Sequence, residues 1–218
     1  MKKIIITLLL VSLFAAAAFA QSGTIREVTG EVELKRPGSA VFVRASGGET
    51  VDLNTVISTG FRSTAIVVIG SSTITVRPLT RLTLREIQSA ENSESINVNL
   101  QAGRVRVDVQ PPQGTRAGFT VQSPSATASV RGTSFEFDTV NLVVREGRVL
   151  FRGSSGAART VNGGFITFVG TDGTAENPIE VTSAATMPSS PVGVVETSTT
   201  AVPSSESTMG DLPLNLIY

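Results

Sequence analysis

The stretch that decides the fold is Gly103-Arg104-Val105-Arg106-Val107-Asp108-Val109. Valine occupies every second position, and charged side chains fill the positions between the valines. Because successive side chains of a β-strand point to opposite faces, this pattern predicts a strand with one buried face. Residues 82–85 (LTLR) and 134–138 (SFEFD) alternate in the same way. Alternation dominates from Thr24 onward, so we predict an all-β protein.

Turn-forming residues separate the alternating runs. Pairs such as Pro37-Gly38, Gly47-Gly48 and Asp172-Gly173 recur about every 10 to 20 residues. Many short strands at such spacing are typical of all-β sandwiches, barrels and solenoids. We therefore expect stacked short antiparallel strands in a twisted arrangement that is β-solenoid-like or sandwich-like.

Three segments carry local predictions of their own. Ala65–Ile69 is continuously apolar, so this strand should be buried on both faces. Residues 86–95 should form a polar loop. Asn162-Gly163 stands between two short apolar runs, which predicts a β-hairpin at this turn.

A short pattern occurs three times. Gly30-Glu31-Val32, Gly103-Arg104-Val105 and Gly147-Arg148-Val149 each place a charged residue between a glycine and a valine. The unequal spacing excludes a strict repeat. The pattern is consistent with stacked units of a solenoid, and equally with coincidence in a chain rich in glycine and valine.

The first twenty residues have the features of a secretory signal peptide. Lys2 and Lys3 precede an apolar run, which ends in Ala18-Phe19-Ala20. This order predicts cleavage after Ala20 and a periplasmic or secreted protein, with no transmembrane span once the signal is removed. The alternative is an uncleaved membrane anchor, although the apolar run is at the lower limit of bilayer-spanning length.

The C-terminal part differs in composition from the rest of the chain. We predict an all-β domain at residues 21–173, a disordered Ser/Thr/Pro-rich linker at 174–210 and a short apolar segment at 211–218. Leu212, Leu214, Leu216 and Tyr218 alternate in this last segment. They could dock by adding a strand to an exposed sheet edge; the alternative is a frayed terminus.

Composition restricts the chemistry available to this chain. The absence of Cys and His excludes thiol nucleophiles, the usual zinc sites and a Ser-His-Asp triad, so we predict neither an enzyme nor a cofactor. Asp172–Asn177 is interpreted as an Asp-Gly turn rather than a calcium loop, because its spacing is wrong for calcium. After Lys2 and Lys3, Lys35 is the one lysine and the other basic residues are arginines. Arginines can bind carboxylates bidentately or simply be solvated on strands. Residues 21–173 contain 16 basic and 13 acidic residues, and this weak excess does not indicate nucleic-acid binding.

The region from about Val28 to Val169 resembles the FecR periplasmic domain family. The densest match is Val121–Phe135 (VQSPSATASVRGTSF), and Ile57–Gly60 with Val144–Val149 follow the family's order. We interpret the motif residues as structural: Pro124, Val130, Arg131, Gly132, Thr133 and Phe135. Gly132 suits a turn with positive φ. Arg131 should donate hydrogen bonds to backbone carbonyls.

The resemblance implies a function in signalling. In the best-known members this domain lies in the periplasm and relays the state of an outer-membrane transporter to a sigma factor. Those members have a cytoplasmic helical segment and a membrane span, and we find neither in this sequence. We therefore expect a non-catalytic periplasmic module that binds another envelope protein. The alternative is a structural protein that binds peptidoglycan or another polysaccharide, although the chain has no Trp and one Tyr. The oligomeric state is not predicted.

Overall fold

The computed structural model describes residues 22–111 and 113–181, and their regular secondary structure consists of strands in two nine-stranded sheets. Sheet A contains, in spatial order, β18 (Ile179–Glu180), β17 (Phe165–Phe168), β14 (Asn141–Glu146), β13 (Ser134–Phe137), β10 (Val105–Val109), β7 (Ser72–Val76), β6 (Thr64–Ile69), β1 (Gly23–Thr29) and β4 (Thr50–Val51). Sheet B contains β16 (Arg159–Asn162), β15 (Arg148–Gly153), β12 (Ala126–Arg131), β11 (Arg116–Gln122), β9 (Ser93–Ala102), β8 (Arg81–Ala90), β5 (Val56–Thr59), β2 (Val32–Lys35) and β3 (Val43–Arg44). The all-β prediction is confirmed.

Two sets of predicted features fall outside this part of the chain. The signal peptide at residues 1–20 and the segment with Leu212, Leu214, Leu216 and Tyr218 are not among the described residues. Within residues 22–111 and 113–181, no helix has the length and apolar character that crossing a membrane requires.

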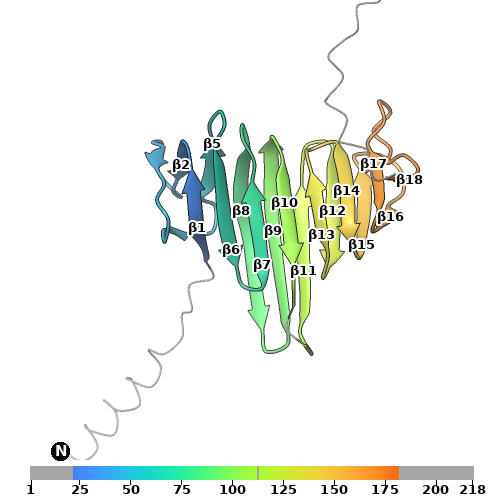
Figure 1. The fold of residues 1–218 in the computed structure, drawn as a ribbon, viewed down its shortest axis with the longest axis horizontal. Coiled ribbons are helices and arrows are strands. Elements are labelled where there is room, and N and C mark those ends of the chain that lie inside the picture. Colours follow the sequence, from blue (N-terminus) through green and yellow to red (C-terminus); the bar gives the residue numbers. More distant parts are fainter. Residues whose placement is uncertain (1–21, 112, 182–218) are drawn as a thin grey trace, which may run out of the picture. The chain divides into compact units, whose positions relative to one another are not determined.

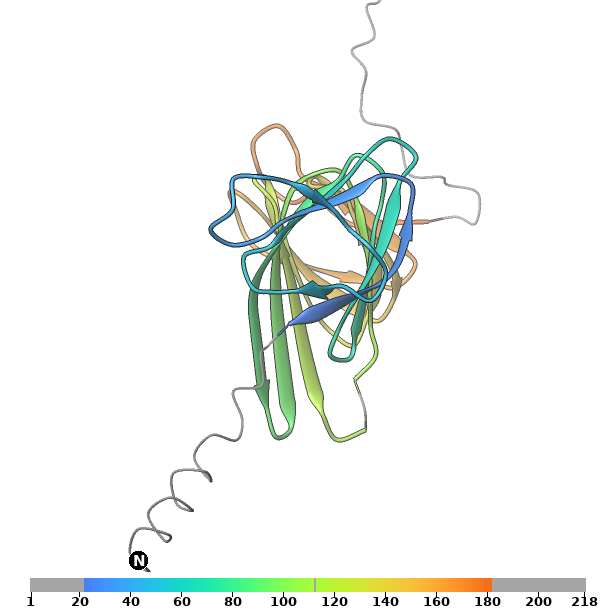
Figure 2. The same cartoon turned by 90° about the vertical axis from the view of Figure 1, so that its left-hand side faces the viewer.

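The chain passes back and forth between the two sheets and adds strands to both as it proceeds. Strands β1 to β4 lie at one end of the sheets, and β14 to β18 lie at the other. The colours in Figure 1 accordingly run from blue to orange along the long axis. Figure 2 looks along this axis and shows the two sheets on opposite sides of the interior. The fold is a sandwich assembled by stacking, which combines the two arrangements expected from the sequence.

Strand pairing is antiparallel throughout the described strands with one exception. β11 pairs with β9 in parallel, with Phe119 opposite Ile96 and Val121 opposite Val98. Along the chain, β10 of sheet A lies between β9 and β11, which both lie in sheet B. The segment after β10 returns the chain to sheet B, and β11 then runs in the same direction as β9. The prediction of stacked antiparallel strands is thus confirmed, apart from this one pair.

Alternating side chains from both sheets form one hydrophobic core. The valines of β10 are buried, as are the apolar residues of β11 and β12 that face them from sheet B. Phe137 of sheet A meets Phe151 of sheet B edge to face, with ring centroids 5.9 Å apart. The prediction for β6 is wrong in part, because Ile66 and Val68 are only half-buried on its outer side.

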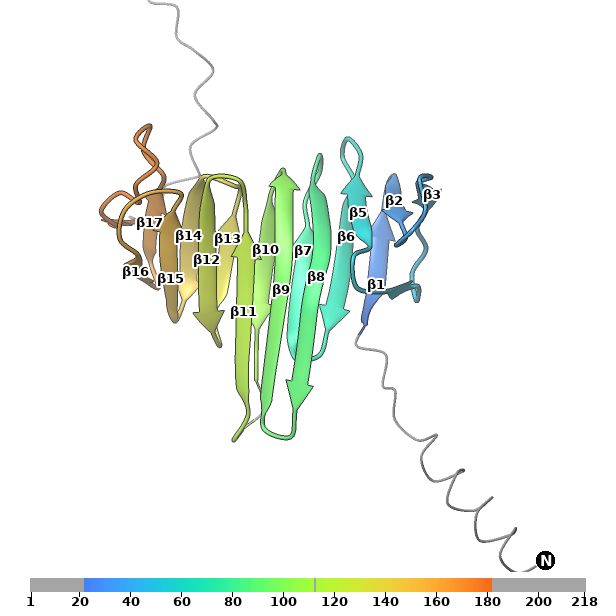
Figure 3. The same ribbon diagram turned by 180° about the vertical axis from the view of Figure 1, so that it is seen from behind.

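The prediction of a polar loop at residues 86–95 is wrong. These residues form the distal half of the β8–β9 hairpin, with Ile87 opposite Ile96 and Ala90 opposite Ser93. Glu94 accepts hydrogen bonds from the backbone and hydroxyl of Ser71, which tie the hairpin to sheet A. Figure 3 shows this hairpin and the start of β11 extending past the neighbouring strands. The polar composition of residues 86–95 led to the wrong prediction, because two strand segments with few apolar residues can still pair with each other.

Asn162-Gly163 does not form the predicted hairpin. β16 pairs with β15 in sheet B, whereas β17 pairs with β14 in sheet A, so this turn carries the chain between sheets. The left-handed residue is Gly164, at φ 84°. The sequence indicates a chain reversal at this point. It does not show with which strands β16 and β17 pair.

The three Gly-charged-Val segments occupy equivalent corners of the fold. Each glycine lies where the chain crosses between sheets, with φ of 78° at Gly30, 86° at Gly103 and 75° at Gly147. A buried hydroxyl lies against each glycine, and it bonds the backbone of the charged residue that follows. These hydrogen bonds are Glu31 N to Ser63 Oγ (2.8 Å), Arg104 N to Thr80 Oγ1 (2.9 Å) and Thr133 Oγ1 to Arg148 O (3.2 Å). The three segments therefore serve one structural purpose.

Sheet A continues beyond residue 173, where composition predicts the linker to begin. Ala175 is buried and bridges to Val169, and β18 pairs with β17. The hydroxyl of the buried Thr167 donates to Glu176 O at 2.7 Å. The fold thus includes residues up to about 180.

Candidate functional site

The motif that resembles the FecR family runs from β12 through a corner into β13. Val130, Thr133 and Phe135 are buried, while Pro124 lies exposed in the turn before β12. Gly132 forms the corner with φ 67°, the positive value expected from the sequence.

Thr133 joins three segments at this corner. Its hydroxyl donates to Arg148 O, and its carbonyl accepts from Val109 N at 3.0 Å. A Cβ on Gly147 would lie 2.8 Å from the Thr133 hydroxyl, so the two residues are in close contact. This geometry gives the Gly-Thr part of the motif a packing role.

Arg131 lies differently from the expectation. Its side chain is exposed and makes no hydrogen bond or ion pair with any described residue. The expected hydrogen bonds to backbone carbonyls are therefore absent among residues 22–111 and 113–181. The reason is alternation along β12, which turns Arg131 outward because Val130 faces the core.

Arg131 belongs to a group of four outward-facing arginines on sheet B. Arg116 lies on β11, and Arg148 and Arg152 lie on β15. All four are exposed and lack an ion pair or side-chain hydrogen bond within the described residues. These arginines with Leu150, which lies between Arg148 and Arg152 on the same face of β15, are called the arginine face below.

The arginine face has no acidic side chain on its own strands. The five adjacent strands β9, β11, β12, β15 and β16 contain one acid, Glu94, which is half-buried and bonded to Ser71. Their other outward positions carry hydroxyl, amide or glycine residues. Glu146, at the end of β14 in sheet A, is exposed and forms no ion pair with Arg148. The positive charge of the arginine face is therefore not neutralised by its neighbours.

Four arginines on or next to β7, β10 and β14 of sheet A are paired with acids, whereas Arg26 on β1 is exposed and forms no ion pair with any described residue. Glu136 binds Arg145 at 2.7 Å and lies 3.9 Å from Arg77. The other two pairs are Arg104 with Asp138 and Arg106 with Asp108, each at 3.2 Å. Near β12 and β15 of sheet B, by contrast, several exposed arginines lie on neighbouring strands without an ion pair among the described residues.

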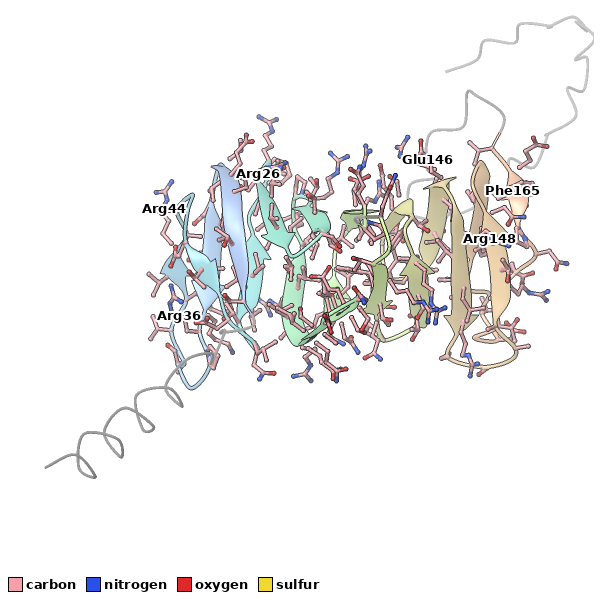
Figure 4. The ribbon with its side chains drawn as sticks, turned by 90° about the horizontal axis from the view of Figure 1, so that it is seen from below. Arg26, Arg36, Arg44, Glu146, Arg148 and Phe165 are labelled. Carbon is pink, nitrogen blue, oxygen red and sulfur yellow. The ribbon has the colours of Figure 1, made fainter. Side chains whose placement is uncertain are left out.

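An open groove of about 670 Å³ lies on the arginine face. Arg131, Arg148, Leu150 and Thr160 are among its lining residues, and they come from β12, β15 and β16. Leu150 is 50% exposed, with Ser129 and Thr160 opposite it on the neighbouring strands. Figure 4 places Arg148 toward the opposite end of the stack from Arg26, Arg36 and Arg44. The groove therefore combines two cationic side chains, Arg131 and Arg148, with the apolar side chain of Leu150.

A second exposed apolar pair lies at two consecutive corners in the first half of the fold. Phe61 is 72% exposed and Leu79 is 61% exposed, and Leu79 N donates to Gly60 O. The adjacent groove is smaller, at about 380 Å³. Two cations near this pair are already in contact with aromatic rings: the Arg62 guanidinium lies 5.5 Å from the centre of the Phe61 ring, and the Arg81 guanidinium lies 5.7 Å from the centre of the Phe42 ring.

Asp172 uses its carboxylate within its own turn. The backbone N–H and the hydroxyl of Thr174 both donate to it, and these hydrogen bonds hold the pKa of Asp172 below its ordinary value. Among residues 22–111 and 113–181, no three acidic side chains gather as a metal site would require.

Residues 55–150 match the family model described as FecR protein. The matched region begins just before β5 and ends within β15, so it includes Arg131, Arg148 and Leu150 but not Arg152. The resemblance inferred from the sequence is confirmed for this region.

Comparison with other proteins adds two solved structures. Both are crystal structures of a "putative anti-sigma factor" from Parabacteroides distasonis. One is 18% identical to this chain and covers 59% of it and 60% of its own length, with a TM-score of 0.48. The other is 16% identical and covers 57% and 59%, with a TM-score of 0.46. The chain thus spans about three fifths of the structures it matches. No curated protein matches the sequence.

Sequence reasoning found Arg131 but missed its partners on the arginine face. Arg148-Val149-Leu150-Phe151-Arg152 alternates like the other strands, and its outward residues could have been identified from that pattern. What sequence could not show is that this strand lies beside β12, with Val149 opposite Val130 and the two arginines next to this pair.

Proposed function

We propose that this protein is a non-catalytic periplasmic module that binds another envelope protein and acts in cell-envelope signalling. The match to the FecR family supports the signalling role, and the predicted signal peptide supports the location. The observation that carries the binding role is the arginine face, where four exposed arginines without partners among the described residues share the outer side of sheet B with Leu150, and two of them, Arg131 and Arg148, line a groove with it. Arginine is enriched at protein interfaces, where its planar guanidinium binds carboxylates bidentately.

The carboxylates of sheet A support a non-catalytic role. A hydrolase that uses paired acids needs them free at a substrate cleft. Here Glu136 and Asp138 are largely buried and bonded to arginines on neighbouring strands, so their charges hold the sheet together.

The test of this proposal is photocrosslinking in intact cells. A photoreactive amino acid replaces Leu150 in the chain with its own N-terminus, and the matched control carries it at Arg26, an exposed position in sheet A. We expect an envelope protein to be captured from position 150 and not from position 26. Capture of the same proteins from both positions, or of none from position 150, would contradict the proposal.

Polysaccharide binding is the second candidate function. The outward hydroxyl and amide residues beside the arginine face favour it, since the Thr120 and Ser129 hydroxyls lie 3.2 Å apart and such groups can bond sugars. Cosedimentation with purified peptidoglycan distinguishes the two candidates. Sedimentation that is lost when Arg131 and Arg148 are replaced by Ala would support the polysaccharide.

A further inference from the structure

We infer that the arginine face recognises an extended, acidic peptide segment in which two carboxylate side chains flank an apolar one at every second position. This inference rests on the proposed function and names the chemistry of the partner. It follows from the spacing, the charge and the exposure of three residues on one strand, Arg148, Leu150 and Arg152.

Strand geometry sets the spacing. Arg148, Leu150 and Arg152 all point outward from β15, while Val149 and Phe151 are buried. Successive outward residues of a strand are about 7 Å apart, because each residue advances the chain by about 3.3 Å. An extended peptide has the same repeat, so acidic, apolar and acidic side chains at alternate positions would meet Arg, Leu and Arg in register.

Electrostatics explains why this partner should be acidic. The register of β12 with β15 pairs Val130 with Val149, and Arg131 and Arg148 are the next residues of the two strands beyond this pair. Like charges directly opposite on neighbouring strands destabilise a sheet, and no acid on these strands relieves them. A carboxylate placed between the two guanidinium groups would accept charge-assisted hydrogen bonds from both.

Leu150 distinguishes a peptide from an anionic glycan. Its side chain is half exposed and lines the groove together with Arg131 and Arg148. A polyanion recognised by charge alone would gain nothing from this leucine. Covering it with an apolar side chain removes apolar surface from water, which favours association. The combination of one apolar and several cationic residues therefore fits a peptide with mixed side chains.

Fluorescence anisotropy with labelled peptides tests the inference on the purified mature chain. The acidic probe is SETVTES, and the matched controls SQTVTQS and SKTVTKS replace both glutamates. We expect the wild-type protein to bind SETVTES about tenfold more tightly than SQTVTQS at low salt, and to lose this preference in 0.5 M NaCl. Equal affinity for the two peptides at low salt would overturn the inference.

Variants of the protein locate the site and test its register. Arg148→Glu with Arg152→Glu should reverse the preference from SETVTES to SKTVTKS, whereas Arg26→Glu in sheet A should leave it unchanged. Leu150→Ser should weaken SETVTES several-fold. If Leu150→Ser has no effect, charge alone determines binding, as for a polysaccharide, and the inference is wrong.

The inference can fail independently of the proposed function. Capture of an envelope protein from position 150 in cells, combined with no preference for SETVTES in vitro, would overturn the acidic-peptide partner and leave protein binding intact. Thermal unfolding checks that each variant is folded, and these exposed side chains lack intramolecular bonds whose loss would unfold the protein.

Discussion

At the residue scale, two glycines illustrate two separate reasons why a position requires glycine: a positive φ and a lack of space for a side chain. Gly38 and Gly147 both have φ 75°, which costs an L-residue about 1 kcal/mol or more. A Cβ on Gly38 would meet nothing within 4 Å, whereas one on Gly147 would lie 2.8 Å from Thr133 Oγ1 and 3.1 Å from Gly132 O. The two positions therefore share the backbone conformation and differ only in crowding.

We predict that Gly147→Ala lowers the free energy of unfolding by about 2 to 4 kcal/mol, and Gly38→Ala by about 1 kcal/mol. The difference measures the close contact with Thr133, because the conformational cost is common to both. Urea unfolding of the two variants provides the measurement. Equal losses would show that crowding at the corner is unimportant.

Arg131 and Thr133 also lead to contrasting predictions. The sequence analysis assigned both to structure, but only Thr133 is buried and hydrogen-bonded. Arg131→Ala should change stability by less than about 0.5 kcal/mol, as is usual for an exposed side chain without partners. Thr133→Val should cost about 1 to 3 kcal/mol, because it removes the donor to Arg148 O inside the corner. A comparable loss in both variants, measured by urea unfolding, would restore the structural assignment of Arg131.

At the element scale, Glu136 links three strands of sheet A. It lies on β13, accepts two hydrogen bonds from Arg145 of β14 and lies near Arg77 after β7. Its side chain is only 10% exposed, so its charge depends on these partners for compensation. The Glu136–Arg145 pair joins neighbouring strands, as does the Arg104–Asp138 pair at the ends of β10 and β13, whereas Arg106 and Asp108 lie on the same strand.

We predict that Glu136→Gln destabilises the protein by about 1 to 3 kcal/mol, because charged hydrogen bonds are replaced by neutral ones. The control is Glu91→Gln, since Glu91 is exposed in the β8–β9 turn. Unfolding in urea at low salt measures both. A Glu136→Gln variant as stable as the Glu91→Gln variant would show that the carboxylate contributes no stability to sheet A.

Element positions followed from local pattern more reliably than element partners. Alternation identified the strand at residues 103–109 and the burial of its valines, because covalent geometry alone makes side chains alternate. It failed at residues 86–95, where the decisive contacts are with Ile96 on the neighbouring strand and, through Glu94, with Ser71 in the other sheet. Such contacts depend on the pairing of whole strands.

At the scale of the whole molecule, the end of the fold can be located by truncation. Residues 174–181 contribute buried Ala175, strand β18 and backbone acceptors for Arg159 and Thr167. A chain ending at residue 173 removes these partners and leaves the Thr167 hydroxyl buried without an acceptor.

We predict that residues 21–173 are less stable than residues 21–181 by about 2 to 4 kcal/mol, from the lost hydrogen bonds and apolar burial. Residues 21–181 should unfold at the same temperature as residues 21–218, because the predicted linker adds no packed contacts. Calorimetry of the three chains is the measurement. The same melting temperature for residues 21–173 and 21–181 would place the boundary at 173, as composition suggests.

The sequence alone determined the all-β class and the inward and outward faces of most strands, because each depends on residues within a few positions of one another. Only the tertiary structure decided which charges meet. Arg104 forms a hydrogen bond with Asp138, 34 residues away, whereas the strand beside Arg131 brings Arg148 and Arg152 rather than an acid. Strand order decides this outcome, because side chains that are distant along the chain become neighbours only when the two sheets are assembled.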